Sequence, residues 1–138
     1  MLARLPGRET MAPRKSVNYP GYKHQNPIPN GSRIGNIMMS SIMNGTEPGT
    51  RNVPADLAGQ VTNLFKHIRL CVEAAGGTVE DIIKVNFWMK QPSTGRAALN
   101  DEWVKMFPDE NSRPARHTLV LGADSAHLAT CDFVAVLD

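Results

Sequence analysis

An amphipathic repeat over residues 54–75 constrains the fold of this 138-residue chain more than any other segment. Apolar residues recur every three or four positions, as on the buried face of an α-helix. These residues are Leu57, Val61, Leu64, Phe65, Ile68 and Val72. The opposite face is expected at the surface and carries Gln60, Lys66, His67 and Arg69. A helix with one apolar face must bury it against another layer, so we expect this helix to cover one face of a sheet.

Strands are expected on both sides of this helix. Residues 82–90 alternate between apolar and polar side chains, as a strand with two different faces does. The other expected strands flank the turn at Gly35-Asn36 within residues 32–41, follow Pro114 through Leu121, and cover residues 128–137. A second helix is expected over residues 96–107. These elements predict an α+β fold, with a mixed β-sheet and two helices packed on one face.

The chain divides into an arm and a single domain. Residues 1–31 hold much of the proline and glycine without a period, so we expect an extended or partly disordered N-terminal arm. Within it, Tyr22 and His24 precede two prolines that favour extended backbone, and this segment could fold over a pocket rim. Residues 32–138 are expected to form the domain. Translation could start at Met1 or at Met11.

Composition narrows the class of protein. The net charge of +2 and the scattered basic residues argue against a nucleic-acid partner. Neither Cys71 nor Cys131 has a partner at metal or redox spacing, which favours a reducing, cytoplasmic compartment. The four histidines show no ligand spacing, so we expect no metal and no cofactor. No apolar run approaches the roughly 20 residues that span a bilayer, so we expect no membrane partner.

Arg116 is the strongest candidate for a binding residue. It follows Pro114 at the start of an expected strand, where packing can hold a guanidinium and offer it to a carboxylate. A surface ion pair is the alternative interpretation, because exposed pairs are common and weak. His117 is expected to point to the other side of this strand.

Several segments together resemble the RidA (YjgF) family of reactive-intermediate deaminases. The resemblance covers roughly residues 35–138 and is carried by the order and spacing of six motifs. These are Asn36-Ile37-Met38-Met39-Ser40-Ser41, Val53-Pro54-Ala55-Asp56-Leu57 with Gln60, Val72-Glu73-Ala74-Ala75-Gly76, Asp81-Ile82-Ile83-Lys84-Val85, Ala98-Leu99-Asn100 and Pro114-Ala115-Arg116. The resemblance implies a chorismate-mutase-like fold and a homotrimer with inter-subunit sites. It also implies a hydrolase that converts an enamine or imine to a 2-oxo acid and ammonia.

The resemblance also implies site residues. Arg116 matches the carboxylate-binding arginine, Asn100 a site asparagine, Tyr22 the arm tyrosine and Ser41 the serine of a Ser-Gly motif. The chain departs from the family pattern at Ile42, where a glycine is usual, and a bulky side chain there would reshape the cleft. A glutamate on the last strand corresponds to Cys131 or, with a one-residue insertion, to the catalytic candidate Asp132. These neighbours face opposite sides of a strand, so the register decides between them.

Three functional interpretations stay open. The first is a deaminase of the 2-iminobutanoate/2-iminopropanoate type, with Asp132 or His24 as proton donor and, as a variant, an aminomuconate-type substrate. The second is a non-catalytic module that binds a small carboxylate metabolite, which the missing glutamate favours. The third, action on RNA or translation, is disfavoured by the near-neutral charge.

Overall fold

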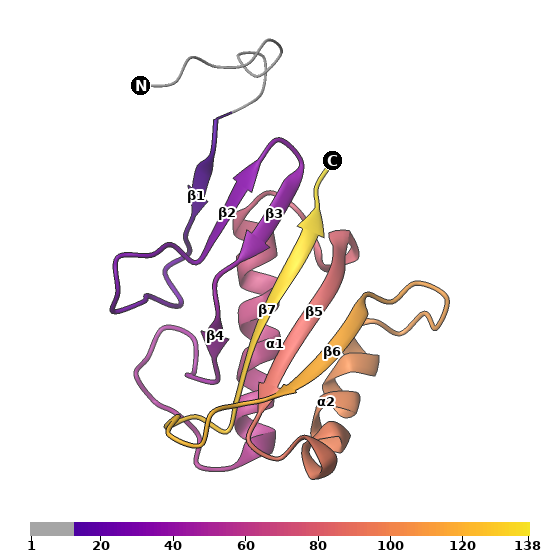
Figure 1. The fold of residues 1–138 in the computed structure, drawn as a ribbon. Coiled ribbons are helices and arrows are strands. Elements are labelled where there is room, and N and C mark those ends of the chain that lie inside the picture. Colours follow the sequence, from indigo (N-terminus) through magenta and orange to yellow (C-terminus); the bar gives the residue numbers. More distant parts are fainter. Residues whose placement is uncertain (1–12) are drawn as a thin grey trace.

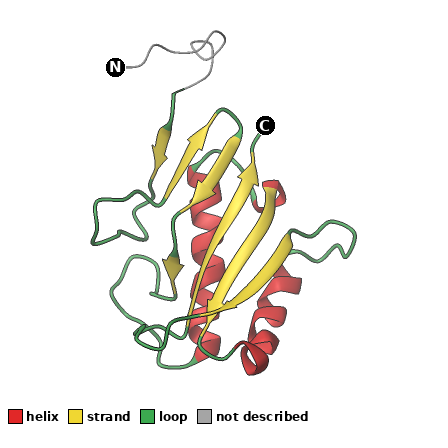
Figure 2. Ribbon diagram, viewed as in Figure 1, coloured by secondary structure: helices red, strands yellow, loops and turns green. Residues whose placement is uncertain are grey.

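The computed structural model describes residues 13–138 and confirms the α+β class: one mixed sheet with two helices on one face (Figures 1 and 2). The strands are β1 (Lys15–Val17), β2 (Gly31–Ile34), β3 (Ile37–Ser40), β4 (Met43–Asn44), β5 (Ile82–Met89), β6 (Ala115–Val120) and β7 (Ala129–Val136). The helices are α1 (Leu57–Ala74), the 3₁₀ helix η2 (Val79–Asp81) and α2 (Pro92–Met106).

Within residues 13–138 the strands form a seven-stranded sheet in the order β1-β2-β3-β7-β5-β6, with β4 paired to β7 outside this path. Only β5 and β6 are parallel among these pairs, because α2 carries the chain back before β6 begins. As a result, β1 and β6 lie at opposite edges of the sheet (Figure 1).

Helix α1 begins at Leu57, three residues later than its pattern suggested. The side chain of Asp56 caps it by accepting a hydrogen bond of 3.2 Å from the backbone N–H of Gly59. Helix α2 begins earlier than expected, because Pro92 occupies the first turn, where a missing N–H costs no hydrogen bond. At η2, Thr78 and Asp81 form a capping box.

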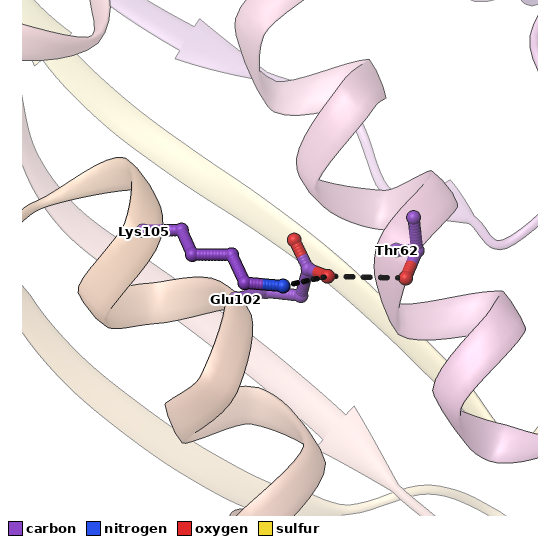
Figure 3. A network of polar contacts seen from close by, with 3 residues as sticks. All are labelled: Thr62, Glu102 and Lys105. Atoms are coloured by element: carbon purple, nitrogen blue, oxygen red, sulfur yellow. Dashed lines mark hydrogen bonds and ion pairs between the residues drawn. The ribbon is translucent and has the colours of Figure 1, made fainter.

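The core lies between the helices and one face of the sheet. Val85, Phe87 and Met89 of β5 are buried and face α1 and α2. Their neighbours Lys84, Asn86 and Trp88 are half-buried and face away from the helices. The helices also contact each other through polar groups: Thr62 donates to Glu102 over 3.2 Å, and Glu102 pairs with Lys105 over 3.6 Å (Figure 3). This pair is largely exposed, so it contributes little to stability.

The face of the sheet opposite the helices exposes apolar side chains. Ile34, Ile37, Met39 and Val136 are 39–55% exposed, and they belong to the neighbouring strands β2, β3 and β7. The pairs Ile34–Ile37 and Ile37–Val136 place three of them in one row across the strands. We call these four residues the open apolar face.

The N-terminal arm expected over residues 1–31 lies partly outside the described residues. Its described part adds β1 to the sheet through pairs such as Ser16–Ser32 and then turns back against α1, where Tyr19 contacts His67. Strand β4, which has two residues, was not expected from the sequence. Among residues 13–138, no helix has the length and apolar character required to cross a membrane.

Candidate functional site

Arg116 is held by two side chains of α2. Its Nη2 donates a hydrogen bond of 2.8 Å to Oδ1 of Asn100, and its guanidinium carbon lies 5.1 Å from the centre of the Trp103 ring. Arg116 pairs with Val85 across the β5–β6 ladder, so it shares the helix-facing side of the sheet. An amide acceptor and an aromatic face fix a guanidinium without neutralising it. We call Arg116, Asn100 and Trp103 the arginine edge, because β6 is the edge strand.

The charge of Arg116 has no counterion among the residues that the structure describes. Within residues 13–138, the only Lys or Arg nitrogen within 4 Å of a carboxylate is that of Lys105, which pairs with Glu102. Partial burial lowers the pKa of Arg116, and the positive charge of Arg96 lowers it further. A fixed guanidinium with no carboxylate beside it is suited to an anionic ligand.

A second group of polar side chains packs the arm onto α1. The Tyr19 hydroxyl lies 2.8 Å from Nδ1 of His67, whose Nε2 lies 2.6 Å from the carbonyl oxygen of Thr46. The ring of Tyr22 meets those of His67 and His24 edge-on, at centroid distances of 4.9 and 5.0 Å. We call Tyr19, Tyr22, His24 and His67 the arm cluster.

Tyr19 and His67 of the arm cluster are buried, and Tyr22 and His24 are half-buried. His67 has no exposed surface, so its expected place on the polar surface of the helix was wrong. Its spacing from Leu64 and Cys71 places it on the buried stripe of α1. Burial lowers the pKa of both His67 and His24 and raises that of Tyr22. Nε2 of His24 is enclosed and has no hydrogen-bond partner among the described residues.

Ser41 and Ile42 lie between β3 and β4. The Ser41 hydroxyl donates a 2.7 Å hydrogen bond to the carbonyl oxygen of Pro29, so it fastens the end of the arm. Ile42 is 47% exposed. Because β3 pairs with β7 at Val134 and β4 pairs with it at Cys131, both residues lie beside Asp132.

The register of β7 separates Cys131 from Asp132. Cys131 faces the helices, pairs with Phe87 and Met43 and has no exposed surface; burial raises its pKa well above the usual value. Asp132 faces the opposite side and accepts a 2.9 Å hydrogen bond from the Asn86 side chain. Asp132 is therefore the accessible member of the two.

A single protomer does not bring all these residues together. Arg116 and Asp132 lie on opposite faces of the sheet, since their partners Val85 and Asn86 are consecutive residues of β5. The arm cluster joins the segment that follows β1 to α1, whereas the arginine edge is at β6, which lies at the opposite end of the strand order from β1. Two hollows of about 460 and 390 Å³ lie along α1, and none of the expected site residues lines either.

The sequence did not single out Trp103, Tyr19 or Arg96 as functional residues. The signal for Trp103 is its spacing of three residues from Asn100, which places both on one face of α2. Tyr19 carried no pattern of its own, and its role depends on the arm folding back on α1.

The structure thus defines an α+β protein with two helices on one face of a mixed sheet and an anchored, uncompensated arginine at the sheet edge. A family described as Endoribonuclease L-PSP has a sequence model that matches residues 27–124. The chain belongs to this family, which is the YjgF/RidA family, and the expected resemblance is confirmed.

Individual relatives agree with this assignment. The chain is 32% identical over 85 residues to a RutC family protein of Haemophilus influenzae, a match that spans 60% of this chain and 65% of that protein. It is 33% identical over 91 residues to the 2-iminobutanoate/2-iminopropanoate deaminase of Escherichia coli, spanning 65% of this chain and 70% of the deaminase. The matched segments thus cover about two thirds of each relative.

A solved structure confirms the fold over most of the chain. The crystal structure of the YjgF gene product of E. coli superposes with a TM-score of 0.78 at 26% identity, covering 88% of this chain and 98% of that one. The chorismate-mutase-like fold expected from the sequence is therefore confirmed.

Proposed function

We propose that the protein hydrolyses the imine or enamine of a 2-amino acid, releasing ammonia and a 2-oxo acid. The observation that carries this proposal is the arginine edge: Arg116 is fixed by Asn100 and Trp103 and has no carboxylate partner among the described residues. The name of the E. coli relative, 2-iminobutanoate/2-iminopropanoate deaminase, supports the same chemistry. Such substrates carry one carboxylate next to the reacting carbon.

The reaction needs few groups. Arg116 holds the substrate carboxylate by charge-assisted hydrogen bonds, which fixes the imine carbon for attack. Water adds to that carbon, a proton moves to the nitrogen, and the carbon–nitrogen bond breaks so that ammonia leaves with the electron pair. Asp132 and His24 are the candidates for moving protons, since one is an accessible carboxylate and the other an imidazole with a free Nε2. Tyr22, Ser41 and Ile42 would shape the wall around the substrate.

We propose that the complete site forms between copies of the chain in a homotrimer. Within one protomer the arginine edge lies apart from Asp132 and from the arm cluster, and this separation supports the proposal. Each of these places on a protomer has only part of the site, and a neighbouring copy would supply the rest. The open apolar face supports it as well, since exposed apolar patches of this kind are usually covered by a partner. One copy would then supply Arg116 and Asn100, and its neighbour Tyr22, His24, Ser41, Ile42 and Asp132.

An assay with imines generated in situ tests the proposed activity. Short-chain imines produced from amino acids by an auxiliary enzyme would be followed by the release of ammonia and 2-oxo acid. Arg116→Ala should lower kcat/KM by about a hundredfold or more, since charge-assisted carboxylate binding in a cleft is lost. Arg116→Lys should retain part of the activity, and Arg51→Ala, which removes an exposed loop arginine, serves as the charge control.

Two outcomes would contradict the proposal. Equal activity of Arg116→Ala and the unaltered protein would exclude the role of Arg116. Absence of hydrolysis for every imine, with carboxylate binding that depends on Arg116, would favour the binding module over the enzyme.

A further inference from the structure

Arg96 adds a second positive charge beside the arginine edge, where one carboxylate would require only Arg116. Arg96 precedes Asn100 by four residues on α2, so both side chains lie on the same helix face, about 6 Å apart along the axis. Asn100 contacts Arg116 directly, so Arg96 lies one helical turn beyond the residue that fixes the anchor. We infer that Arg96 is a second anion-binding residue of this site and that the substrate is the imine of a short dicarboxylic acid.

The electrostatics of the site agree with this geometry. The positive charge of Arg96 is close enough to lower the pKa of Arg116. Neither arginine has a carboxylate within 4 Å in the described part of the chain. Two like charges left side by side without a counterion oppose folding, so a bound anion with two charges would stabilise the arrangement. A substrate with one carboxylate leaves one guanidinium unpaired.

The inference rests on the proposed function but concerns a separate property. Arg116 would bind the carboxylate next to the imine carbon, as in any substrate of this type. Arg96 is exposed on the first half of α2, where it can reach a carboxylate at the far end of the substrate. Arg96 therefore sets the preference for a dicarboxylic over a monocarboxylic substrate, while the bond that breaks stays the same.

Titration of the full-length protein with product-like acids tests the inference without catalysis. The probes are 2-oxoglutarate, with two carboxylates, and 2-oxobutanoate, with one. The unaltered protein should bind 2-oxoglutarate about tenfold more tightly, because it gains one charge-assisted contact. In Arg96→Gln the two dissociation constants should become equal within about threefold. Arg69→Gln, which removes an exposed arginine of α1, should keep the difference.

The results separate this inference from the proposed function. Equal binding of the two acids by the unaltered protein, or a preference that persists in Arg96→Gln, would overturn the inference even if imines are hydrolysed. A preference for 2-oxoglutarate that is lost in Arg96→Gln would support Arg96 as a second anion-binding residue, and this result does not depend on whether an imine is hydrolysed. Inorganic phosphate that binds more tightly than 2-oxoglutarate, and only with Arg96 present, would instead assign the residue to a phosphate. For an active enzyme, the ratio of kcat/KM for dicarboxylic over monocarboxylic imines should fall about tenfold in Arg96→Gln.

Discussion

Arg116 and His67 show how single residues of this chain acquire a function from their partners. The Trp103 ring and the Asn100 amide hold Arg116 while leaving its charge available. His67 is held in a different way, because both ring nitrogens have partners. Burial lowers the pKa of His67 and so favours the neutral imidazole. In that form Nε2 donates to the carbonyl oxygen of Thr46, which can only accept, and Nδ1 accepts from the Tyr19 hydroxyl. These contacts tie the arm to α1.

This neutral state predicts a pH-dependent stability. Burial lowers the pKa of His67, so below about pH 6.5 the unfolded chain binds more protons than the folded protein. The free energy of unfolding should therefore decrease as the pH falls from about 7 to 5. Denaturant unfolding at a series of pH values measures this slope, to which the half-buried His24 contributes in the same direction.

The variant His67→Gln should reduce the slope, since the titrating group is removed. His117→Gln, at an exposed strand position, is the matched control and should leave the slope unchanged. Tyr19→Phe should lower the free energy of unfolding at pH 7 by about 1–3 kcal/mol, because Nδ1 of His67 loses its donor inside the protein. Identical slopes in His67→Gln and the unaltered protein would exclude His67 as the source.

Among the helices and strands, the sequence predicted those in which apolar residues recur with a helical or a strand period. The repeat of Leu57, Val61 and Leu64 identified α1, and the alternation around Phe87 identified β5 with its correct buried side. Gln60 and His67 were expected on the exposed face of α1 because they are polar, but both lie on its buried stripe. Their polar atoms are satisfied by partners distant in sequence, such as Leu128 and Tyr19, and no local pattern reports those contacts.

The short strand β4 shows a second limit. Two residues carry no measurable alternation, and β4 exists because Met43 and Asn44 pair with β7. The candidate site also depends on contacts that no local pattern shows. Arg116 was predicted from its position at the start of a strand, and Asn100 was predicted from the family resemblance. The contact between them depends on how α2 packs beside β6. The register of β7, which distinguishes Cys131 from Asp132, also required the structure.

Gly45 supports a prediction about how β4 meets α1. A methyl group at Gly45 would lie 2.6 Å from the Cα atom of Gln60, too close for any adjustment of a side chain to relieve. Gly45→Ala should therefore lower the free energy of unfolding by more than about 2 kcal/mol, as overpacking against backbone does. Equilibrium unfolding in denaturant measures this change.

The control for this prediction is Gly49→Ala. Gly49 has a φ of 78° and open space around its Cα atom, so only backbone strain opposes the substitution. The loss there should be about 1 kcal/mol. If Gly45→Ala were no more destabilising than Gly49→Ala, this result would contradict the close contact between Gly45, which follows β4, and Gln60 of α1.

For the whole molecule, the open apolar face is the feature that a single protomer leaves unexplained. Two helices cover one side of the sheet (Figure 2). The other side exposes Ile34, Ile37, Met39 and Val136. Assembly of several copies would bury this surface and bring the arginine edge of one copy to its neighbour. The substitution Met39→Glu should then convert the oligomer into smaller species, because a carboxylate cannot be buried unpaired at an apolar contact.

Light scattering coupled to size-exclusion chromatography measures the mass in each case. Val53→Glu introduces the same charge at a 41% exposed position in the loop before α1, outside the open apolar face and the arginine edge, and it should leave the mass unchanged. A mass equal to that of one chain for the unaltered protein would contradict the proposed trimer.

The central claim, that each site combines Arg116 of one copy with Asp132 of its neighbour, is tested most directly by mixing two inactive variants. Arg116→Ala and Asp132→Asn would be purified separately, then unfolded together and refolded. If sites are shared in a random trimer, about one quarter of them receive both intact residues, so activity should recover to about a quarter of that of the unaltered protein. A mixture as inactive as each variant alone, while mass measurements show mixed oligomers, would contradict the account.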